Sequence, residues 1–144
     1  MKQVLLPLIL ILSLAAAHGE TGVMGLWMNP TGSTIQIYRC GANVCAKVFA
    51  ISSKAPARID AGNPDPALRK RSLCDLEIGK NFHLTSPDRA EDGRLYDPES
   101  GKTYSGSMTS DGNTLRLRGY IGISLFGRTE IWTRAREGIT PCRS

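Results

Sequence analysis

The chain has 144 residues, with 18 lysines and arginines against 13 aspartates and glutamates, and a formal charge of +5 at pH 7. This length suits one domain with one hydrophobic core. The longest apolar run lies at the N-terminus, and no stop-transfer segment follows it, so we expect a protein that does not span a membrane.

Residues 1–17 have the parts of a cleavable secretory signal peptide. Lys2 precedes an apolar run, and the small residues Ala15 and Ala17 supply the A-x-A pattern at its end. The run is shorter than the roughly 20 residues that a membrane-spanning helix needs. We therefore predict cleavage after Ala17, a periplasmic or secreted location, and a mature domain of residues 18–144.

The predicted mature chain keeps 17 basic residues against the 13 acidic ones, because only Lys2 leaves with the signal peptide. A basic surface attracts nucleic acid, anionic lipid and acidic ligands through its summed field. An exported protein does not meet intracellular nucleic acid, so nucleic acid is not predicted as a partner. An anionic surface or another envelope protein is left as a candidate partner. No cysteine lies near the cleavage site, which disfavours a lipid anchor.

Four cysteines lie in the predicted mature chain, which favours two disulfides among three possible connectivities. Cys40 and Cys45 flank a turn-like Gly-Ala-Asn-Val insert between two β-rich runs, so they can face each other across a hairpin. By elimination Cys74 joins Cys142, and this bridge ties down the C-terminal tail. A zinc site is the alternative to disulfides, but C-x4-C without a nearby histidine is a poor match to structural-zinc spacing. No metal or cofactor is predicted.

Short runs of β-branched and aromatic residues alternate with Gly, Asn, Asp and Pro, a pattern typical of an all-β protein. Turn-forming residues at 29–32, 97–101 and 111–113 predict antiparallel neighbours. Eight strands are enough to close a small up-and-down barrel. The predicted strands are Val23–Met28, Ser33–Arg39, Val44–Ile51, Leu76–Leu84, Gly93–Tyr96, Thr103–Ser110, Thr114–Tyr120 and Phe126–Ala135.

One segment, Asn63–Arg71, departs from the β pattern. Asp65 is placed to cap a helix that begins at Pro66, and helix formers follow. We predict a helix of one or two turns in the longest connection of the barrel, between Ile51 and Leu76, where loops often carry function.

Two groups of acidic residues are interpreted as loop residues rather than as sites. Asp60, Asn63 and Asp65 lack the glycine and the distal glutamate of an EF-hand, and Asx turns with a helix cap explain them. The acidic run at 88–92 lies in turn-like sequence, and we predict a solvated loop there.

Gly25-Leu26-Trp27 and Trp132-Thr133-Arg134 resemble the lipocalin arrangement. In that superfamily the tryptophan of a first-strand G-x-W packs beside an arginine from the end of the barrel. The resemblance implies that Arg134 stacks on Trp27, which suits a barrel whose closure joins its first and last strands.

A longer set of motifs resembles a bacterial family of exported proteins, domain of unknown function 2147. The resemblance covers the chain from about Gly25 to Arg134 and implies a lipocalin-like barrel, but no catalytic residues. It implies a glycine in the region after Leu73, where this chain has Asp75. The motifs are Asn63-Pro64-Asp65-Pro66 with Arg69 and Arg71, Leu95-Tyr96-Asp97-Pro98 with Gly101-Lys102-Thr103-Tyr104, and Arg118-Gly119-Tyr120 with Phe126-Gly127-Arg128 and Trp132-Thr133-Arg134.

The residues offer few groups for catalysis. His18 and His83 are the two histidines, and the chain has no G-x-S-x-G elbow, P-loop, H-E-x-x-H or paired-carboxylate motif. We therefore expect a protein that is not an enzyme.

An eight-stranded barrel of lipocalin type can hold one small molecule inside. Arg118 and Tyr120 lie two apart on a strand and resemble the Arg-x-Tyr carboxylate clamp of fatty-acid-binding barrels, although Leu115 and Leu117 claim the interior face by alternation. The candidate ligand-binding residues are Trp27, Tyr38, Tyr104, Arg118, Tyr120, Phe126, Trp132 and Arg134.

The leading interpretation is an exported, non-enzymatic binder of a small apolar or amphipathic molecule. One alternative is an envelope interaction protein with a filled core that uses the 63–71 loop or a basic face. Another is an enzyme whose site no motif reveals. A real internal cavity would favour the binder. A filled core with an exposed apolar or basic patch would favour the interaction protein, and buried titratable groups with perturbed pKa values would favour the enzyme.

Overall fold

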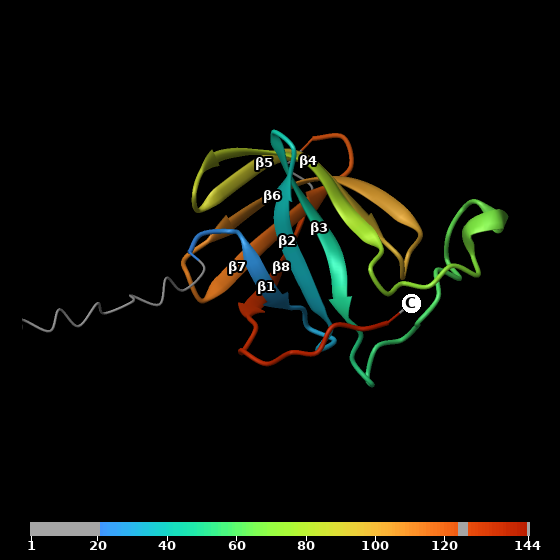
Figure 1. Ribbon diagram of the computed structural model, residues 1–144. Coiled ribbons are helices and arrows are strands. Elements are labelled where there is room, and N and C mark those ends of the chain that lie inside the picture. The colour runs from blue at the N-terminus through green and yellow to red at the C-terminus, as the bar shows by residue number, and fades with distance from the viewer. Residues whose placement is uncertain (1–20, 124–126, 144) are drawn as a thin grey trace, which may run out of the picture.

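The computed structural model describes residues 21–123 and 127–143, and in it eight antiparallel strands close into a barrel (Figure 1). Each strand pairs with its neighbours in chain order, and β1 also pairs with β8, so the predicted all-β up-and-down barrel is confirmed. The elements are β1 (Gly25–Met28), β2 (Thr34–Cys40), β3 (Asn43–Ala50), η1 (Pro66–Leu68), β4 (Glu77–Ser86), β5 (Arg89–Asp97), β6 (Lys102–Ser110), β7 (Thr114–Tyr120) and β8 (Arg128–Arg134).

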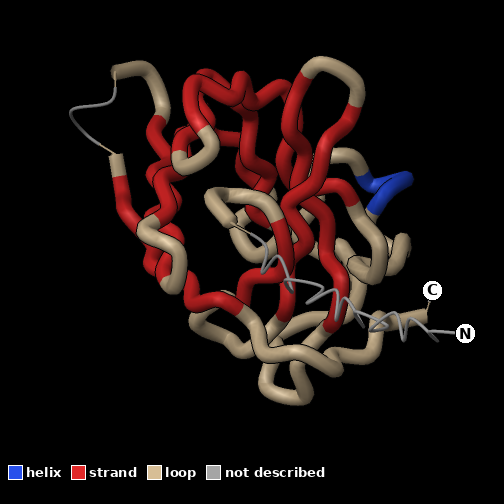
Figure 2. The backbone as a smooth tube through the Cα atoms, turned by 60° about the vertical axis from the view of Figure 1, so that its left-hand side comes forward, coloured by secondary structure: helices blue, strands red, loops and turns tan. Residues whose placement is uncertain are grey.

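The predicted signal peptide with its cleavage site, and also Phe126, lie outside the described residues. Within the described ranges, no helix is long and apolar enough to cross a membrane. Figure 2 shows the strands as a continuous wall with loops at its ends, and the short helix outside that wall.

The short helix is confirmed as a single 3-10 turn in the β3–β4 connection. The Asp65 carboxylate accepts a hydrogen bond from the Ala67 backbone N–H at 2.9 Å, and Pro66 occupies the first helical position. Both residues act as the sequence predicts, because an N-cap oxygen and a fixed proline φ favour this start.

The predicted loop over the acidic run is wrong, since β5 begins at Arg89 and not at Gly93. Asp92 adopts a φ of 58°, and the pairing of β5 with β6 shifts between Ala90 and Gly93. This irregularity adds one residue, so Ala90 and Gly93 are both buried although they lie three apart. The bulge hides the two-residue alternation by which a strand is recognised.

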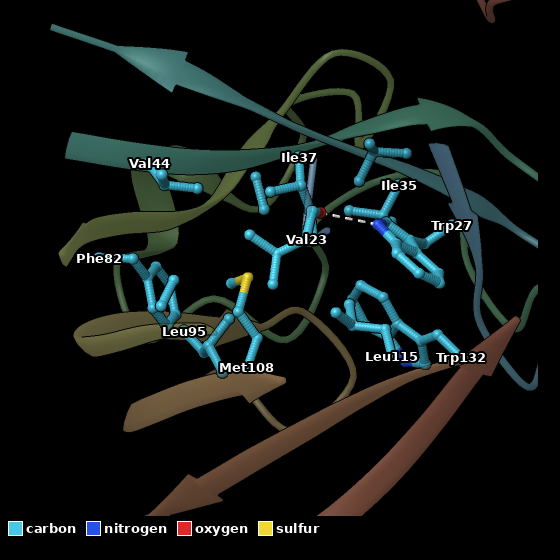
Figure 3. Close-up of a cluster of buried hydrophobic side chains, with 13 residues drawn as sticks. Val23, Trp27, Ile35, Ile37, Val44, Phe82, Leu95, Met108, Leu115 and Trp132 are labelled. Atoms are coloured by element: carbon cyan, nitrogen blue, oxygen red, sulfur yellow. Dashed lines mark hydrogen bonds between the residues drawn. The ribbon is translucent and has the colours of Figure 1, made fainter. Parts of the chain in front are cut away.

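The segment before β1 fills one end of the barrel, which we call the closed end. The Val23 backbone N–H donates to the Pro87 carbonyl at 2.9 Å, and the Val23 carbonyl accepts a hydrogen bond from the Trp27 indole N–H at 2.9 Å. Figure 3 shows Val23 between the aromatic and aliphatic side chains of the core. The fully buried large side chains include Trp27, Ile37, Val44, Phe82, Met108 and Leu115.

Gly93 gives the Phe82 ring its place in this core. A Cβ atom at Gly93 would lie 2.2 Å from Cγ of Phe82, which is closer than real contacts allow. Phe82 itself is fully buried, so the ring cannot turn out to solvent without exposing its whole surface. The sequence therefore needs glycine at 93 for steric reasons.

We predict that Gly93→Ala lowers the free energy of unfolding by about 1–3 kcal/mol, because the added methyl group overpacks the core. Urea unfolding measures the loss. Gly119→Ala is the matched control, since its Cβ meets the nearest atom of Tyr104 at an ordinary 3.5 Å. The cost of Gly93→Ala should shrink in a Phe82→Leu background, and an undiminished cost there would contradict the steric explanation.

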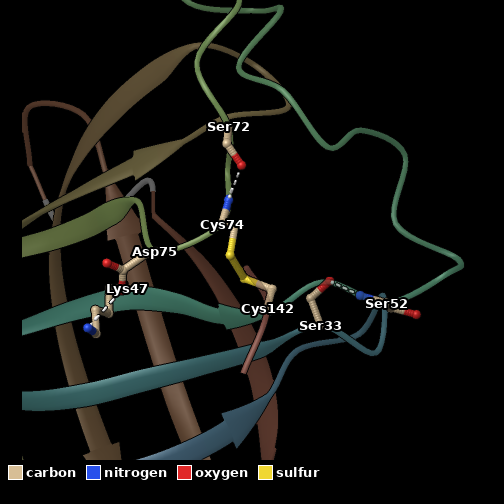
Figure 4. Close-up of a disulfide and its surroundings, with 7 residues drawn as sticks. All are labelled: Ser33, Lys47, Ser52, Ser72, Cys74, Asp75 and Cys142. Atoms are coloured by element: carbon tan, nitrogen blue, oxygen red, sulfur yellow. Dashed lines mark hydrogen bonds and ion pairs between the residues drawn. A yellow bond between two sulfur atoms is a disulfide. The ribbon is translucent and has the colours of Figure 1, made fainter. Parts of the chain in front are cut away.

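Both predicted disulfides are confirmed. Cys40–Cys45 spans the β2–β3 hairpin, and Cys74–Cys142 joins the end of the β3–β4 connection to the C-terminal tail (Figure 4). The Cys142 backbone N–H also donates to the Phe49 carbonyl at 2.8 Å, so the tail is held to β3.

Asp75, next to Cys74, adopts the left-handed conformation with a φ of 61°. Glycine adopts this conformation without steric cost, which agrees with the glycine that the family resemblance implies there. Aspartate tolerates the conformation, and its carboxylate forms an ion pair with Lys47 at 2.8 Å (Figure 4).

We predict that the two disulfides contribute unequally to stability. Cys74 and Cys142 are 68 residues apart, and Cys40 and Cys45 only 5. Chain-entropy estimates give about 4 kcal/mol for the long loop and about 2 kcal/mol for the short one. Thermal unfolding of the two double Cys→Ser variants tests this, and an equal loss would show that loop length does not decide their effect.

Candidate ligand-binding site

The barrel is hollow at the end opposite Val23, which we call the open end. Here the β1–β2, β3–β4 and β5–β6 connections meet, and β7 ends and β8 begins at the same end, because strand direction alternates around the barrel. The long β3–β4 connection, which projects at the right of Figure 1, lies beside this end. Two cavities are found at this end, and each is lined in part by these connections.

The first cavity, which we call the mouth cavity, has a volume of about 430 Å³ and opens inside the barrel. Its walls combine large apolar side chains with charged ones. They comprise Ile35, Ile78, Leu95, Tyr104, Leu117 and Trp132, together with Asn29, Tyr96, Asp97, Pro98, Glu99, Gly119, Arg128, Thr129 and Glu130.

The second cavity, which we call the lateral cleft, has a volume of about 330 Å³ and lies under the β3–β4 connection. Its walls are mainly aliphatic. The apolar ones are Ile35, Val48, Ile51, Ala55, Pro56, Ala57, Ile59, Ala61, Leu73, Ile78 and Pro98, and the others are Asn29, Thr31, Ser33, Gly62, Asp97 and Glu99. Ile35, Ile78 and Pro98 also line the mouth cavity, so the two spaces adjoin.

Strand alternation places Glu130 and Trp132 on the same inner face of β8. The Trp132 indole N–H donates to the Glu130 carboxylate at 2.5 Å, which fixes one oxygen of that carboxylate. Asp97 is engaged differently, because its two oxygens accept hydrogen bonds from the Glu99 backbone N–H and the Ser100 hydroxyl. Asp97 thus shapes the β5–β6 turn while its charge remains at the mouth.

Of the predicted ligand-binding residues that the structure describes, Tyr104 and Trp132 line the mouth cavity. Trp27 and Arg134 lie elsewhere, where the first and last strands meet. The Arg134 guanidinium stacks 3.8 Å from the centre of a Trp27 ring and donates hydrogen bonds to the carbonyls of Gly22 and Met24. The stacking that the lipocalin resemblance implies is therefore present.

The remaining described candidates line neither cavity. Leu117 and Gly119 line the mouth cavity. Arg118 and Tyr120, which alternate with them along β7, do not. Arg118 instead donates to the Thr129 hydroxyl across the strand pair. An inward Arg-x-Tyr clamp is consequently not formed. Tyr38, likewise, lies in neither cavity, and its hydroxyl donates to the Glu77 carboxylate at 3.4 Å.

Sequence reasoning missed a buried carboxylate in the β3–β4 connection. Asp60 is fully buried and forms an ion pair with Arg71 at 2.7 Å. It also accepts hydrogen bonds from the Asn63 amide at 2.8 Å and the Tyr96 hydroxyl at 2.5 Å. An Asx turn explains Asn63, whose side chain accepts from the Asp65 N–H, but not Asp60.

This network ties the long connection to the barrel. Tyr96 belongs to β5, whereas Asp60 and Arg71 lie near the two ends of the excursion that contains the short helix. Close packing of Gly62 on Gly101 adds a second contact, since a Cβ at Gly101 would lie 2.0 Å from the Gly62 carbonyl oxygen. The wall of the lateral cleft is thereby held in place.

A family model described as an uncharacterized protein conserved in bacteria (DUF2147) matches residues 25–134. The chain belongs to the DUF2147 family. No curated protein matches it. Among solved structures it is similar to protein HP1028 from the human pathogen Helicobacter pylori, which belongs to the lipocalin family. That similarity has a TM-score of 0.71 at 21% identity and covers 79% of this chain and 83% of HP1028, which shows a lipocalin-like fold.

The DUF2147 motifs described from the sequence acquire physical roles in this structure. Asn63, Arg71 and Tyr96 hold Asp60, and Gly101 allows the close approach of the long connection. Arg69 donates to the Asn63 carbonyl at 2.8 Å, so it also serves the connection. These motifs position the walls of the lateral cleft.

Asp60 links the pH to the stability of this DUF2147 barrel. Burial raises the pKa of Asp60, but the hydrogen bonds from Tyr96, Asn63 and Arg71 outweigh it and hold that pKa below the ordinary value. The ionised carboxylate therefore contributes stability that is complete above the unfolded-state pKa of about 4 and is lost as the pH falls through the lower folded-state pKa.

We predict that Asp60→Asn lowers the free energy of unfolding by about 2 kcal/mol at neutral pH, because Arg71 and Tyr96 lose a charged acceptor. The difference from the native protein should narrow below about pH 4, as the native carboxyl takes up its proton. Urea unfolding across a pH series measures both curves. Tyr96→Phe should move the acid loss to higher pH, and parallel curves for all three proteins would contradict this role of Asp60.

Proposed function

We propose that this protein is an exported binding protein that holds one small amphipathic molecule at the open end of its barrel, and that it is not an enzyme. The observation that carries the proposal is the pair of adjoining cavities with different walls. The lateral cleft offers aliphatic surface, and the mouth cavity offers aromatic and charged groups. One molecule with an apolar part and a polar part matches both.

The cavity sizes support this reading. The two volumes of about 330 and 430 Å³ fall within the range of about 300–1,000 Å³ that small-molecule sites occupy. The closed end is packed with large buried side chains, so the space at the open end is not the result of a generally loose core. Eight-stranded barrels of lipocalin type are known to hold one ligand inside.

The ordering of the open end also favours binding. Asp60, Tyr96 and the Cys74–Cys142 disulfide hold the walls of the cleft before any ligand arrives. A site that is already ordered loses less conformational entropy on binding. Export, the second part of the proposal, rests on the signal-peptide pattern of residues 1–17 and on the four cysteines, all of which pair in the structure.

We predict that native mass spectrometry of the protein purified gently from the exported fraction of its own cells detects a stoichiometric small molecule that unfolding releases. Extraction under denaturing conditions then identifies the class of the molecule. A mass that equals the disulfide-bonded chain cleaved after Ala17 would confirm the export prediction. The same mass with no bound molecule would speak against a tightly held ligand.

The second test uses the neutral fluorophore N-phenyl-1-naphthylamine, which we predict binds and brightens in the apolar walls. Leu117→Trp, which fills the mouth cavity, should weaken this binding at least about tenfold. Ile131→Trp is the matched control, because Ile131 lies on the outer face of neighbouring β8 and is 44% exposed. Equal binding by both folded variants would place the fluorophore outside the cavity and overturn the proposal.

A further inference from the structure

We infer that the head group that this site selects is an ammonium cation, and that Glu130 is the residue that recognises it. The inference rests on the proposed function and specifies its ligand. Three features of the mouth cavity carry it: the sign of its charge, the position of Glu130, and the aromatic walls beside that carboxylate.

The mouth cavity is acidic although the chain is basic. The charged residues among its described walls are Asp97, Glu99, Glu130 and Arg128, whose formal charges sum to −2. The whole chain carries +5. Asp97 and Glu99 also line the lateral cleft, and none of its described wall residues is basic. The open end therefore attracts cations against the overall charge of the protein.

Glu130 lies on the inner face of β8, opposite Leu117 in the pairing of β7 with β8. The Trp132 indole fixes one of its oxygens. A carboxylate has about four acceptor positions, so this one hydrogen bond orients the group and leaves it able to accept others. Glu130 stands ready to contact a ligand with its charge held at a defined place.

Internal ion pairs do not neutralise this carboxylate. Across residues 21–123 and 127–143, the salt bridges are Lys47–Asp75, Arg71–Asp60 and Arg89–Glu91. Neither Glu130 nor Arg128 belongs to one, although they lie two apart on the same strand. An ammonium group that enters the mouth cavity would supply the opposite charge that Glu130 lacks.

Aromatic side chains add a second attraction for a cation. Tyr96, Tyr104 and Trp132 line the same cavity, and aromatic faces bind ammonium groups through their quadrupole. A carboxylate head would gain little here, because the described walls offer it Arg128 as an opposite charge against the three like charges of Asp97, Glu99 and Glu130. The apolar part of the ligand then extends along Ile35 and Ile78 into the lateral cleft.

The test compares three amphiphiles with the same chain: dodecylammonium, dodecanol and dodecanoate, each below its micelle concentration at neutral pH. We expect dodecylammonium to bind about tenfold more tightly than dodecanoate, with dodecanol between them, as measured by calorimetry. Glu130→Gln keeps an acceptor for the Trp132 indole and should remove most of this difference. Binding of dodecanol should stay unchanged.

Two matched variants sharpen the result. Arg128→Gln should increase the preference for dodecylammonium, since it removes the cationic residue among the described walls. Glu137→Gln removes an exposed carboxylate that lines neither cavity and should leave the preference as it is. Dodecyltrimethylammonium separates the two attractions, because it keeps the cation for the aromatic faces but cannot donate a hydrogen bond to Glu130.

The outcomes separate this inference from the proposed function. If all three amphiphiles bind equally in the native protein and in Glu130→Gln, the cavity binds apolar chains and the ammonium inference is wrong. Tighter binding of dodecanoate would also overturn it and would identify Arg128 as the selecting group. If none of the three binds, and N-phenyl-1-naphthylamine does not bind either, the proposed function itself fails.

Discussion

The stacking of Arg134 on Trp27 is the interaction on which the rest of the structure depends. The seam between β1 and β8 has only two registered residue pairs, and Arg134 and Trp27 form one of them. The guanidinium covers the indole at 3.8 Å and also donates to the Gly112, Met24 and Gly22 carbonyls. One side chain thus joins the last strand, the first strand and the segment before it, because a planar guanidinium both stacks and donates in several directions.

Closure at this seam decides where the barrel is full and where it is hollow. The segment held by Arg134 carries Val23 into the closed end, where the large side chains of the core surround it. With this end filled, the remaining interior volume lies at the open end. There the charged side chains of Glu130 and Arg128 begin where the apolar core stops. Because Val23 and the segment before β1 fill the closed end, the charged wall residues and the cavity lie together at the open end.

The sequence predicts the strands, turns and disulfides of the barrel better than it predicts the residues of the candidate site. Alternation at Thr114–Tyr120, the turn residues and the Cys40–Cys45 spacing are local signals, and the structure agrees with each. Asp60 has no such signal, because its partners Arg71 and Tyr96 are 11 and 36 residues away and meet it only after the barrel closes. Glu130 and Trp132 lie two apart on one face of β8, but a charged residue in a strand is more often found on the outer face, and Glu130 is not among the residues predicted from the sequence.

A lipocalin-like fold alone does not specify a ligand, because the same barrel serves many functions. What distinguishes this chain is the contrast between its basic surface and its acidic mouth. Surface lysines and arginines keep the protein hydrated and cost little, whereas a buried carboxylate loses its hydration and needs a compensating charge. Buried Asp60 has that charge in Arg71, whereas Glu130 is exposed to solvent and belongs to none of the salt bridges among the described residues. The carboxylate of Glu130 lines the mouth cavity, where a cationic ligand can supply the opposite charge.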